Sequence, residues 1–137
     1  MVIREVYRSD LPAINELLQE LSVFKPKDPQ DEESWQSFTS QANLVAIVAV
    51  IDEVVVGYGT LLIERKIRGG KAGHIEDIVS HPDFRGMGIG RAIIDYLAER
   101  AVDLGCYKLV LQCSEANRRF YERGGYQQVH VAMQKFL

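Results

Sequence analysis

The chain of 137 residues contains only two cysteines, Cys106 and Cys113. They do not form a Cys-x-x-Cys pair, and no histidine stands near either of them at a spacing typical of metal ligands. The sequence therefore indicates neither a disulfide framework nor a zinc site. We interpret both cysteines as reduced thiols within the core, and we expect no metal in the chemistry of this protein.

Long apolar runs and a strong excess of one charge are also missing. The longest apolar run, residues 44–51, is far shorter than the roughly 20 residues that a transmembrane helix needs. Residues 1–5 lack the features of a signal peptide. The net charge of −3 argues against the basic surface of a nucleic-acid-binding protein. We therefore expect a cytoplasmic protein whose partners include neither a membrane nor a nucleic acid.

The composition that is present is typical of a globular domain. Hydrophobic residues make up 47% of the chain and charged residues 26%, values close to the average for soluble proteins. A chain of this length can bury a continuous core, and it shows neither a repeat nor a linker. We predict one domain over residues 1–137.

The spacing of apolar residues predicts alternating strands and helices. Strands are predicted at residues 2–7, 44–51, 54–63, 72–80, 108–113 and 126–136. A first helix is predicted to begin at the capping sequence 9–12, and a second to span 31–41. A third runs from the glycine-rich segment at 86–90 to Gly105, and a fourth spans 114–124. This order predicts an α+β fold with one mixed, mostly antiparallel central sheet that is flanked by helices.

The glycine-rich segment before the third predicted helix carries the clearest functional signal. It runs Arg85-Gly86-Met87-Gly88-Ile89-Gly90-Arg91. Glycines let backbone N–H groups converge on one point, and the start of a helix adds partial positive charge. The segment lacks both the third glycine of a dinucleotide fingerprint and the Gly-Lys-Ser/Thr of a Walker loop. It predicts a pyrophosphate site, although a plain structural turn can have the same pattern.

This Arg-x-x-Gly-x-Gly loop resembles the coenzyme A pyrophosphate loop of the GNAT superfamily of N-acetyltransferases. Residues 114–126, which include Ser-Glu-Ala-Asn-Arg-Arg-Phe-Tyr, are similar to the second cofactor motif of these enzymes and follow in the right order. The resemblance implies a GNAT-type fold, acetyl-CoA as the cofactor, and a homodimer. The apolar final strand, with Val129, Val131 and Met133, would provide an edge for pairing across the subunits.

Further segments resemble the glucosamine-6-phosphate N-acetyltransferase family more narrowly. They are the Gly-His-Ile-Glu-Asp-Ile-Val run at 73–79, the run at 105–111, and Cys-Ser-Glu at 113–115. One position departs from the pattern, because that family usually has an aspartate where this chain has Gln112. An amide cannot ionise, so it cannot hold an ammonium group or orient a base as an aspartate can.

The resemblance also implies a set of cofactor-binding residues. The backbone of Ile78 and Val79 would hold the pantetheine arm, and the loop at 85–91 would hold the pyrophosphate. Asn117 could hydrogen-bond the cofactor or serve only as a local helix cap. The predicted cofactor-binding residues are Ile78, Val79, Arg85, Gly86, Met87, Gly88, Ile89, Gly90, Arg91, Asn117 and Tyr121.

Acetyl transfer to an amine needs a group that accepts a proton and a group that donates one to the departing thiolate. Glu76 lies in an apolar strand, where burial would make it a better proton acceptor, and the resemblance implies that it positions or deprotonates the amine. Asp77 would point to the opposite face of a regular strand. Tyr121 is the expected proton donor. A structural ion pair for Glu76 and core packing for Tyr121 are the alternatives, and His74 and His81 are alternative bases.

The predicted acceptor site combines Glu76, Asp77 and Gln112 with the basic loop at 65–71. Such a loop is usually a solvated turn, but Lys66, Arg68 or Lys71 could receive an anionic group. The favoured function is direct acetyl transfer, in a ternary complex, to the amine of an amino sugar phosphate such as glucosamine 6-phosphate. Gln112 keeps open another amine, such as a polyamine, an amino acid derivative or a peptide. A non-catalytic coenzyme A sensor is the third possibility.

Overall fold

The computed structural model describes residues 1–24 and 32–137, and in these ranges five strands form one sheet. The strands are β1 (Val2–Glu5), β2 (Leu44–Ile51), β3 (Val54–Arg65), β4 (Lys71–Ser80) and β5 (Cys106–Val110), in that spatial order. Strands β1 to β4 pair antiparallel, and β4 pairs parallel with β5 because a helical crossover joins them. The predicted mixed, mostly antiparallel sheet is confirmed.

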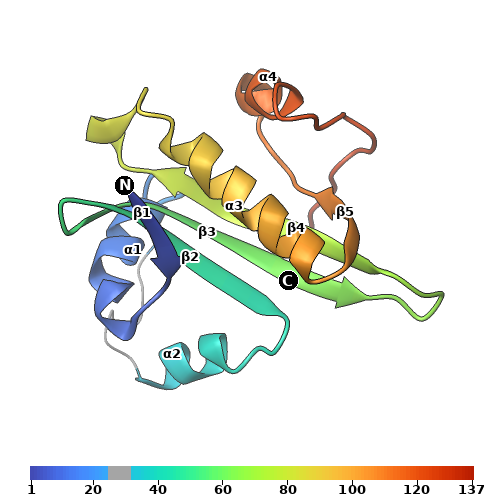
Figure 1. The fold of residues 1–137 in the computed structure, drawn as a ribbon, viewed down its shortest axis with the longest axis horizontal. Helices are drawn as coiled ribbons and strands as arrows, with labels where there is room; N and C mark the ends of the chain where they lie inside the picture. The colour runs from blue at the N-terminus through green and yellow to red at the C-terminus, as the bar shows by residue number, and fades with distance from the viewer. Residues whose placement is uncertain (25–31) are drawn as a thin grey trace.

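The helices of the described residues are α1 (Leu11–Leu18), α2 (Glu32–Thr39), α3 (Ile89–Asp103) and α4 (Arg118–Glu122). Helix α3 is the crossover between β4 and β5 and packs on one face of the sheet, while α1 packs on the other (Figure 1). Short 3-10 turns lie at Arg8–Asp10, Pro82–Phe84 and Glu115–Asn117. The predicted start of the second helix, at residue 31, lies outside the described residues.

Two apolar clusters hold this three-layer arrangement together. On one face, Ile93 and Leu97 of α3 pack against Leu61 of β3, and all three are fully buried. On the other face, Ile14 and Leu17 of α1 pack against a second set of sheet residues. Full burial of such a side chain contributes about 1.5–3 kcal/mol. Strands β3 and β4 are therefore fixed from both sides, which makes them a rigid support for a site.

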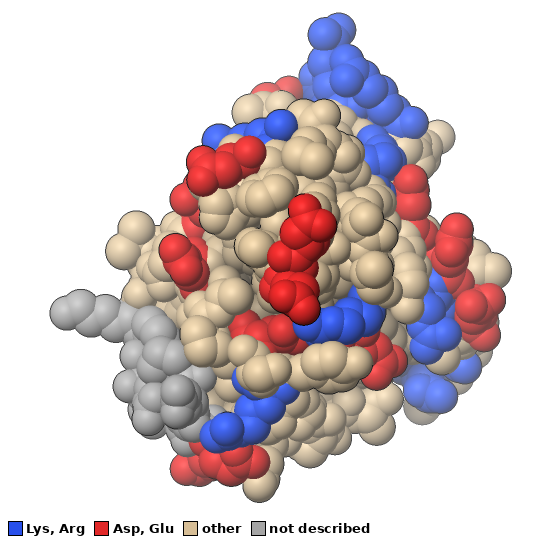
Figure 2. Space-filling model, turned by 60° about the vertical axis from the view of Figure 1, so that its left-hand side comes forward, with Lys and Arg blue, Asp and Glu red and all other residues tan. Residues whose placement is uncertain are grey.

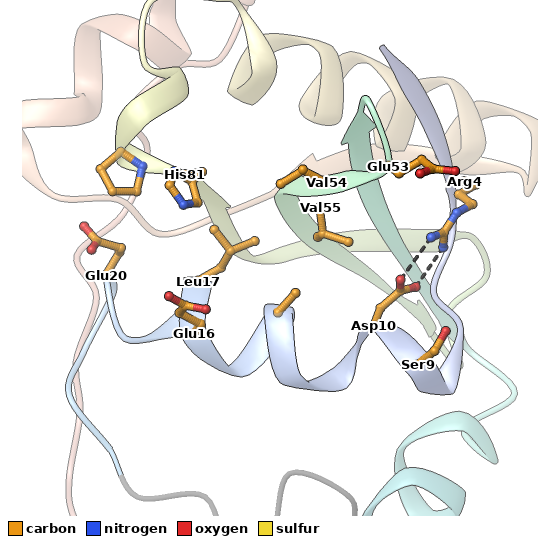
Figure 3. Close-up of a pocket in the computed structure, with 12 residues that line it drawn as sticks. Arg4, Ser9, Asp10, Glu16, Leu17, Glu20, Glu53, Val54, Val55 and His81 are labelled. Carbon is orange, nitrogen blue, oxygen red and sulfur yellow. Dashed lines mark hydrogen bonds and ion pairs between the residues drawn. The ribbon is translucent and has the colours of Figure 1, made fainter.

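Asp10, in the predicted capping sequence at 9–12, is the N-cap of α1, but its side chain makes no capping hydrogen bond. Its carboxylate, 5% exposed, accepts hydrogen bonds from Arg4 Nη1 at 2.7 Å, from Arg4 Nη2 at 2.9 Å and from the Tyr7 N–H at 2.7 Å (Figure 3). Burial pushes the pKa of Asp10 upward, but these hydrogen bonds and the Arg4 charge outweigh burial and leave the pKa below its ordinary value. The ion pair thus ties β1 to the start of α1.

The predicted last strand is wrong. Residues 126–137 follow α4 without strand structure, and Val129, Val131 and Met133 are 70%, 88% and 92% exposed. A strand forms only when its N–H and C=O groups find partners, and no strand in the described chain pairs with this segment. The strand before it is also displaced, since β5 begins at Cys106 and ends at Val110 rather than running over 108–113.

The surface carries charges of both signs. Figure 2 shows basic and acidic side chains interspersed on one side of the molecule, with basic groups gathered at the upper end. No helix in residues 1–24 and 32–137 is long and apolar enough to cross a membrane. The same residues contain no group of three or more His, Cys, Asp or Glu side chains that could hold a metal ion. Both cysteines are free, but Cys113 is exposed, so the predicted burial of this thiol is wrong.

Candidate active site

The sheet opens between β4 and β5. The two strands pair only from Lys71 to His74 of β4, and the later residues of β4 pair with β3 alone among the described strands. Where two neighbouring strands diverge, the backbone groups along the opened edge become available to a ligand. This edge, at residues 75–80, contains Ile78 and Val79, which the sequence analysis assigns to the cofactor.

A β-bulge interrupts β4 at the same place. Thr60 pairs with Glu76 and Tyr58 pairs with Val79, so one residue of β3 faces two residues of β4. Asp77, inside the bulge, has a φ of +54°, which is rare for a residue other than glycine. The predicted alternation of Glu76 and Asp77 across a regular strand is therefore wrong. Backbone strain of this kind clusters at functional sites.

Glu76 lies on the face of the sheet that α1 covers. Its cross-strand partner Thr60 alternates with Leu61, which belongs to the cluster on the α3 face, and cross-strand partners share a face. The Thr60 hydroxyl donates to the Glu76 C=O at 3.1 Å. The Glu76 side chain is exposed, so the predicted burial of this carboxylate is wrong. Its exposure leaves it accessible to a bound amine.

Asp77 is exposed and lies near enough to Tyr58 for its charge to act on that phenol. Burial and, after it, the negative charge of Asp77 raise the pKa of Tyr58, which packs beneath α1. Two exposed carboxylates thus stand next to each other at the opened edge. A primary amine is cationic in water at neutral pH, and a pair of carboxylates suits its capture.

The loop at 85–91 presents backbone donors to open space. Gly88 is the N-cap of α3, with a φ of +76° and no side-chain cap, and its C=O accepts the Ala92 N–H at 3.0 Å. The N–H groups of residues 88–91 therefore have no partner within the helix. A Cβ added to Gly86 or Gly88 would meet no atom within 4 Å. No acidic side chain occupies the first turn of α3, so these residues fit the pyrophosphate of coenzyme A.

The two arginines of this loop direct their side chains toward protein partners. Arg85, which is 66% exposed, forms an ion pair of 3.2 Å with Glu20, beyond the end of α1. Arg91 donates a hydrogen bond to the Phe120 C=O, and its guanidinium carbon lies 4.5 Å from the centre of the Phe120 ring. The contribution of Arg91 to the loop is therefore its backbone N–H, whereas its side chain belongs to the contacts of α4.

Tyr121 lies on α4 within a group of aromatic rings. Its ring centre is 5.1 Å from that of Phe120 and 5.9 Å from that of Tyr126, both in edge-to-face geometry. Burial raises the pKa of Tyr121, Cys113 raises it further, and Arg91 lowers it in part. The hydroxyl is therefore protonated at neutral pH. Asn117, the N-cap of α4, makes no side-chain capping hydrogen bond, so the structure gives no support to its alternative role as a cap.

Lys66 folds back toward the sheet. Its Nζ lies 3.1 Å from Glu64 Oε1, and the same oxygen lies 2.9 Å from His74 Nε2. His74 and Glu76 share one face of β4 and are two residues apart, about 7 Å along the strand. The hydrogen bond with His74 lowers the pKa of Glu64 the most, and the hydrogen bond from Lys66 lowers it further. A cation and an imidazole thus lie on the same face as Glu76.

The other two cations of the basic loop lie elsewhere. Arg68 is exposed at the tip of the β3–β4 connection, at the end of the hairpin that projects to the right in Figure 1. Lys71 Nζ donates to the Leu104 C=O at 2.9 Å, where it satisfies a carbonyl at the end of α3. The predicted use of Lys71 for a substrate anion is therefore not supported, since its ammonium group has a structural partner.

Two pockets mark the surface near these residues. A groove of about 1050 Å³ lies between β5, α4 and the C-terminal segment, and both Gln112 and Tyr121 line it. A pocket of about 630 Å³ lies between α1 and the start of β3 (Figure 3), with Glu16, Glu20 and His81 in its wall. This second pocket contains none of the predicted cofactor or substrate residues. His81, one of the alternative bases, lines this pocket, whereas Glu76 does not.

Comparison with known proteins identifies the family of this chain. Residues 11–126 match the model of the acetyltransferase (GNAT) family. The chain belongs to the GNAT family. Glucosamine 6-phosphate N-acetyltransferase 1 of Dictyostelium discoideum is 36% identical over 128 residues, which cover 90% of this GNAT chain and 82% of that protein. The glucosamine 6-phosphate N-acetyltransferase of Trypanosoma brucei brucei is 37% identical, with coverages of 90% and 87%.

Solved structures lead to the same family. The crystal structure of glucosamine-6-phosphate N-acetyltransferase from Arabidopsis thaliana matches this GNAT chain with a TM-score of 0.92 and 31% identity, over 98% of this chain and 97% of that one. The resemblance drawn from the two motifs is thereby confirmed, and so are the fold class and the assignment as an acetyltransferase.

Several residues that shape the site have no predicted role. Glu64 has no predicted role, although its separation of two from Lys66, directly after the β-branched run 54–63, is a signal that both side chains project from one face. Thr60 is a hydroxyl-bearing residue in an apolar strand, and such a group must find a hydrogen-bond partner when buried. The contact of Glu20 with Arg85 spans 65 positions of sequence, and no local pattern could have indicated it.

Proposed function

We propose that this GNAT acetyltransferase transfers the acetyl group of acetyl-CoA to the primary amine of an amino sugar phosphate such as glucosamine 6-phosphate. The observation that carries the proposal is the opened edge of β4, which has Glu76 on the α1 side while Tyr121 packs with the cluster on the α3 side. Proteins named for this activity in D. discoideum and T. brucei match 90% of the chain.

Acetyl-CoA would lie along the opened edge and the start of α3. The N–H groups of residues 88–91 would bind its pyrophosphate, and the backbone of Ile78 and Val79 would bind its pantetheine arm. Asn117 has its side chain free of a capping bond and is proposed to contact the same arm. When bound, acetyl-CoA supplies the acetyl group as a thioester.

The chain itself would supply a proton acceptor and a proton donor on opposite sides of the sheet. Glu76 would orient the amine and take up its proton at the carboxylate, directly or through water. Asp77 would assist in holding the ammonium form. Tyr121 would hold a proton on Oη for the departing sulfur, because a phenol whose pKa is raised by burial is protonated at neutral pH.

An anionic acceptor is favoured by the charges beside Glu76. Lys66 and His74 lie on the same face of the sheet, and Arg68 lies at the tip of the adjoining loop. A phosphate group could pair with the Lys66 ammonium in place of Glu64. Gln112 lines the groove beside Tyr121, and it favours the second candidate, a different amine such as a polyamine, an amino acid derivative or a peptide.

A panel of amines tests the proposal. Release of the coenzyme A thiol from acetyl-CoA should be measured with glucosamine 6-phosphate, glucosamine, polyamines, amino acid derivatives and peptides. We expect glucosamine 6-phosphate to have the highest kcat/KM and to exceed glucosamine. Tight coenzyme A binding without thiol release from any amine would instead indicate a sensor. A preference for a polyamine or a peptide would overturn the proposed acceptor, while the assignment as an acetyltransferase would stand.

The Gln112→Asp variant sharpens this test. If Gln112 weakens an otherwise ordinary amino-sugar site, the carboxylate should raise kcat/KM for glucosamine 6-phosphate, because it can hold the amine or orient a base. In an enzyme specialised for another amine, the same change should give no gain with the sugar phosphate.

We also propose that the protein is a homodimer in which residues 126–136 pair with the partner subunit. Strand β5 is an edge of the sheet, and the large apolar side chains of the C-terminal segment are exposed beside it. Light scattering at micromolar concentration should give the mass of a dimer. The Val131→Asp variant should be monomeric, while Val23→Asp, at a position of similar exposure (92%), should remain dimeric. A monomeric parent protein would refute the proposal.

A further inference from the structure

The short helix that carries Tyr121 has an incomplete hydrogen-bond pattern at its end. Helix α4 contains five residues, too few to be stable without tertiary contacts. The Gly124 N–H donates to the Tyr121 C=O at 2.8 Å, and the Tyr126 N–H donates to the same oxygen at 3.2 Å. Among the described residues, no backbone N–H is left to donate to the Phe120 C=O. Arg91 Nη2 donates to it instead.

The Arg91 guanidinium makes a second contact with the same residue. Its carbon lies 4.5 Å from the Phe120 ring centre, in the geometry of a cation–π interaction. Phe120 in turn packs edge-to-face on Tyr121 at 5.1 Å. A side chain from the start of α3 therefore fixes both the backbone and the ring of the residue that precedes Tyr121.

Gly124 makes room for this guanidinium. A Cβ added to Gly124 would collide with Arg91 Nη1 and would lie 3.3 Å from the Tyr121 C=O. Gly124 is not among the glycines with a left-handed φ, so the space needed by Arg91, rather than backbone conformation, explains why this position is a glycine. Gly125, the next residue, has a φ of +89° and terminates the helix.

We propose that Arg91 is a positioning residue for Tyr121. Its backbone N–H belongs to the cofactor loop, and its side chain holds α4 in register with that loop. The proposal rests on the proposed role of Tyr121 as proton donor. It differs from a phosphate-binding role for the arginine, because the guanidinium is directed to Phe120. A displacement of about 1 Å of a reacting group can lower the rate of the chemical step by a hundredfold.

The Arg91→Met variant tests the proposal, because it keeps the backbone N–H and the length of the side chain but removes the donor and the charge. We expect kcat to fall roughly 10- to 100-fold, the Kd for coenzyme A to stay within threefold, and amide hydrogen exchange over residues 118–126 to become faster. Gly124→Ala, which displaces the guanidinium, should have the same effects. Arg91→Lys should recover part of kcat. Arg100→Met, on the same helix at a surface position, is the matched control and should resemble the parent.

A double-mutant cycle separates this proposal from the proposed function. If Arg91 acts through Tyr121, Arg91→Met should lower kcat little further in a Tyr121→Phe background. Unchanged exchange over 118–126 in Arg91→Met would overturn the positioning role, whatever the activity. A weaker Kd for coenzyme A with unchanged kcat would overturn it in favour of phosphate binding. A different result would be faster hydrogen exchange in Arg91→Met together with a Tyr121→Phe variant that keeps the kcat of the parent. That result would refute the role of Tyr121 as proton donor and would leave the contact of Arg91 with α4 intact.

Discussion

Replacing Gly88 by valine should separate the stability of the cofactor loop from its ability to bind. Gly88 has a φ of +76°, and a Cβ there would meet no atom within 4 Å. The cost in the free protein is therefore backbone strain alone, about 1–2 kcal/mol for a residue in the left-handed region. For a domain of this size, we expect Tm to fall by roughly 3–10 °C.

The effect on binding has a different origin. The valine side chain would occupy the space in front of the N–H groups of residues 88–91, where we place the pyrophosphate. Each hydrogen bond to a charged group contributes about 1.5–3 kcal/mol. Loss of one such bond weakens binding roughly 10- to 150-fold. Calorimetric titration with coenzyme A should show this increase in Kd.

Gly69→Val provides the matched control. Gly69 has a φ of +94°, also has no atom within 4 Å of an added Cβ, and lies in the β3–β4 connection rather than in the cofactor loop. Its valine variant should lose a similar amount of thermal stability and bind coenzyme A as the parent does. If Gly88→Val and Gly69→Val had the same Kd, the pyrophosphate would not lie against Gly88, and the reasoning would be refuted.

Three further predictions concern catalysis and stability. Tyr121→Phe should keep the Kd for coenzyme A and lower kcat roughly a hundredfold; an unchanged kcat with chemistry rate-limiting would count against the role of Tyr121. Glu76→Gln should lower kcat more than it weakens binding, and the reverse pattern would indicate a binding role alone. Asp10→Asn should lower the free energy of unfolding by about 3 kcal/mol, because it breaks the buried pair with Arg4. Since the folded-state pKa of Asp10 lies below its ordinary value of 3.8, the pair should stabilise fully above about pH 4 and lose this contribution as pH falls through the folded-state pKa. Urea unfolding of the parent and of Asp10→Asn at several pH values measures this contribution to the free energy of unfolding. If the stability of Asp10→Asn fell with pH as steeply as that of the parent, the role of the pair would be contradicted.

Much of the fold could be predicted from the sequence because the signals are local. Alternation of apolar residues indicates strands, and the spacing of Ile89, Ile93 and Leu97 indicates one buried face of a helix. The glycines of the proposed cofactor loop were also recognisable, since the feature proposed to bind is their backbone, free of side chains. Membership of the GNAT family followed from two such motifs in the right order.

The conformation of the C-terminal segment could not be predicted in this way. Residues 126–136 have the composition of a strand, and local propensity alone predicts one. A strand exists, however, only where another strand accepts its hydrogen bonds, and the described residues of a single chain provide no such neighbour. Composition thus determined that this segment is able to pair, while the presence of a partner decides whether it does.

The chemistry of the site is likewise divided between what the sequence determines and what the tertiary structure decides. The sequence by itself determined which residues are able to act as acid, base or anion binder, because these abilities belong to the side chains. Tertiary structure alone decided that Glu76 is exposed beside a bulge and that Lys66 lies on the same face of the sheet as His74. It also decided that Lys71 bonds the end of α3 and that Arg91 contacts the helix of Tyr121. These outcomes depend on strand register and on contacts between residues far apart in sequence, which no local pattern contains.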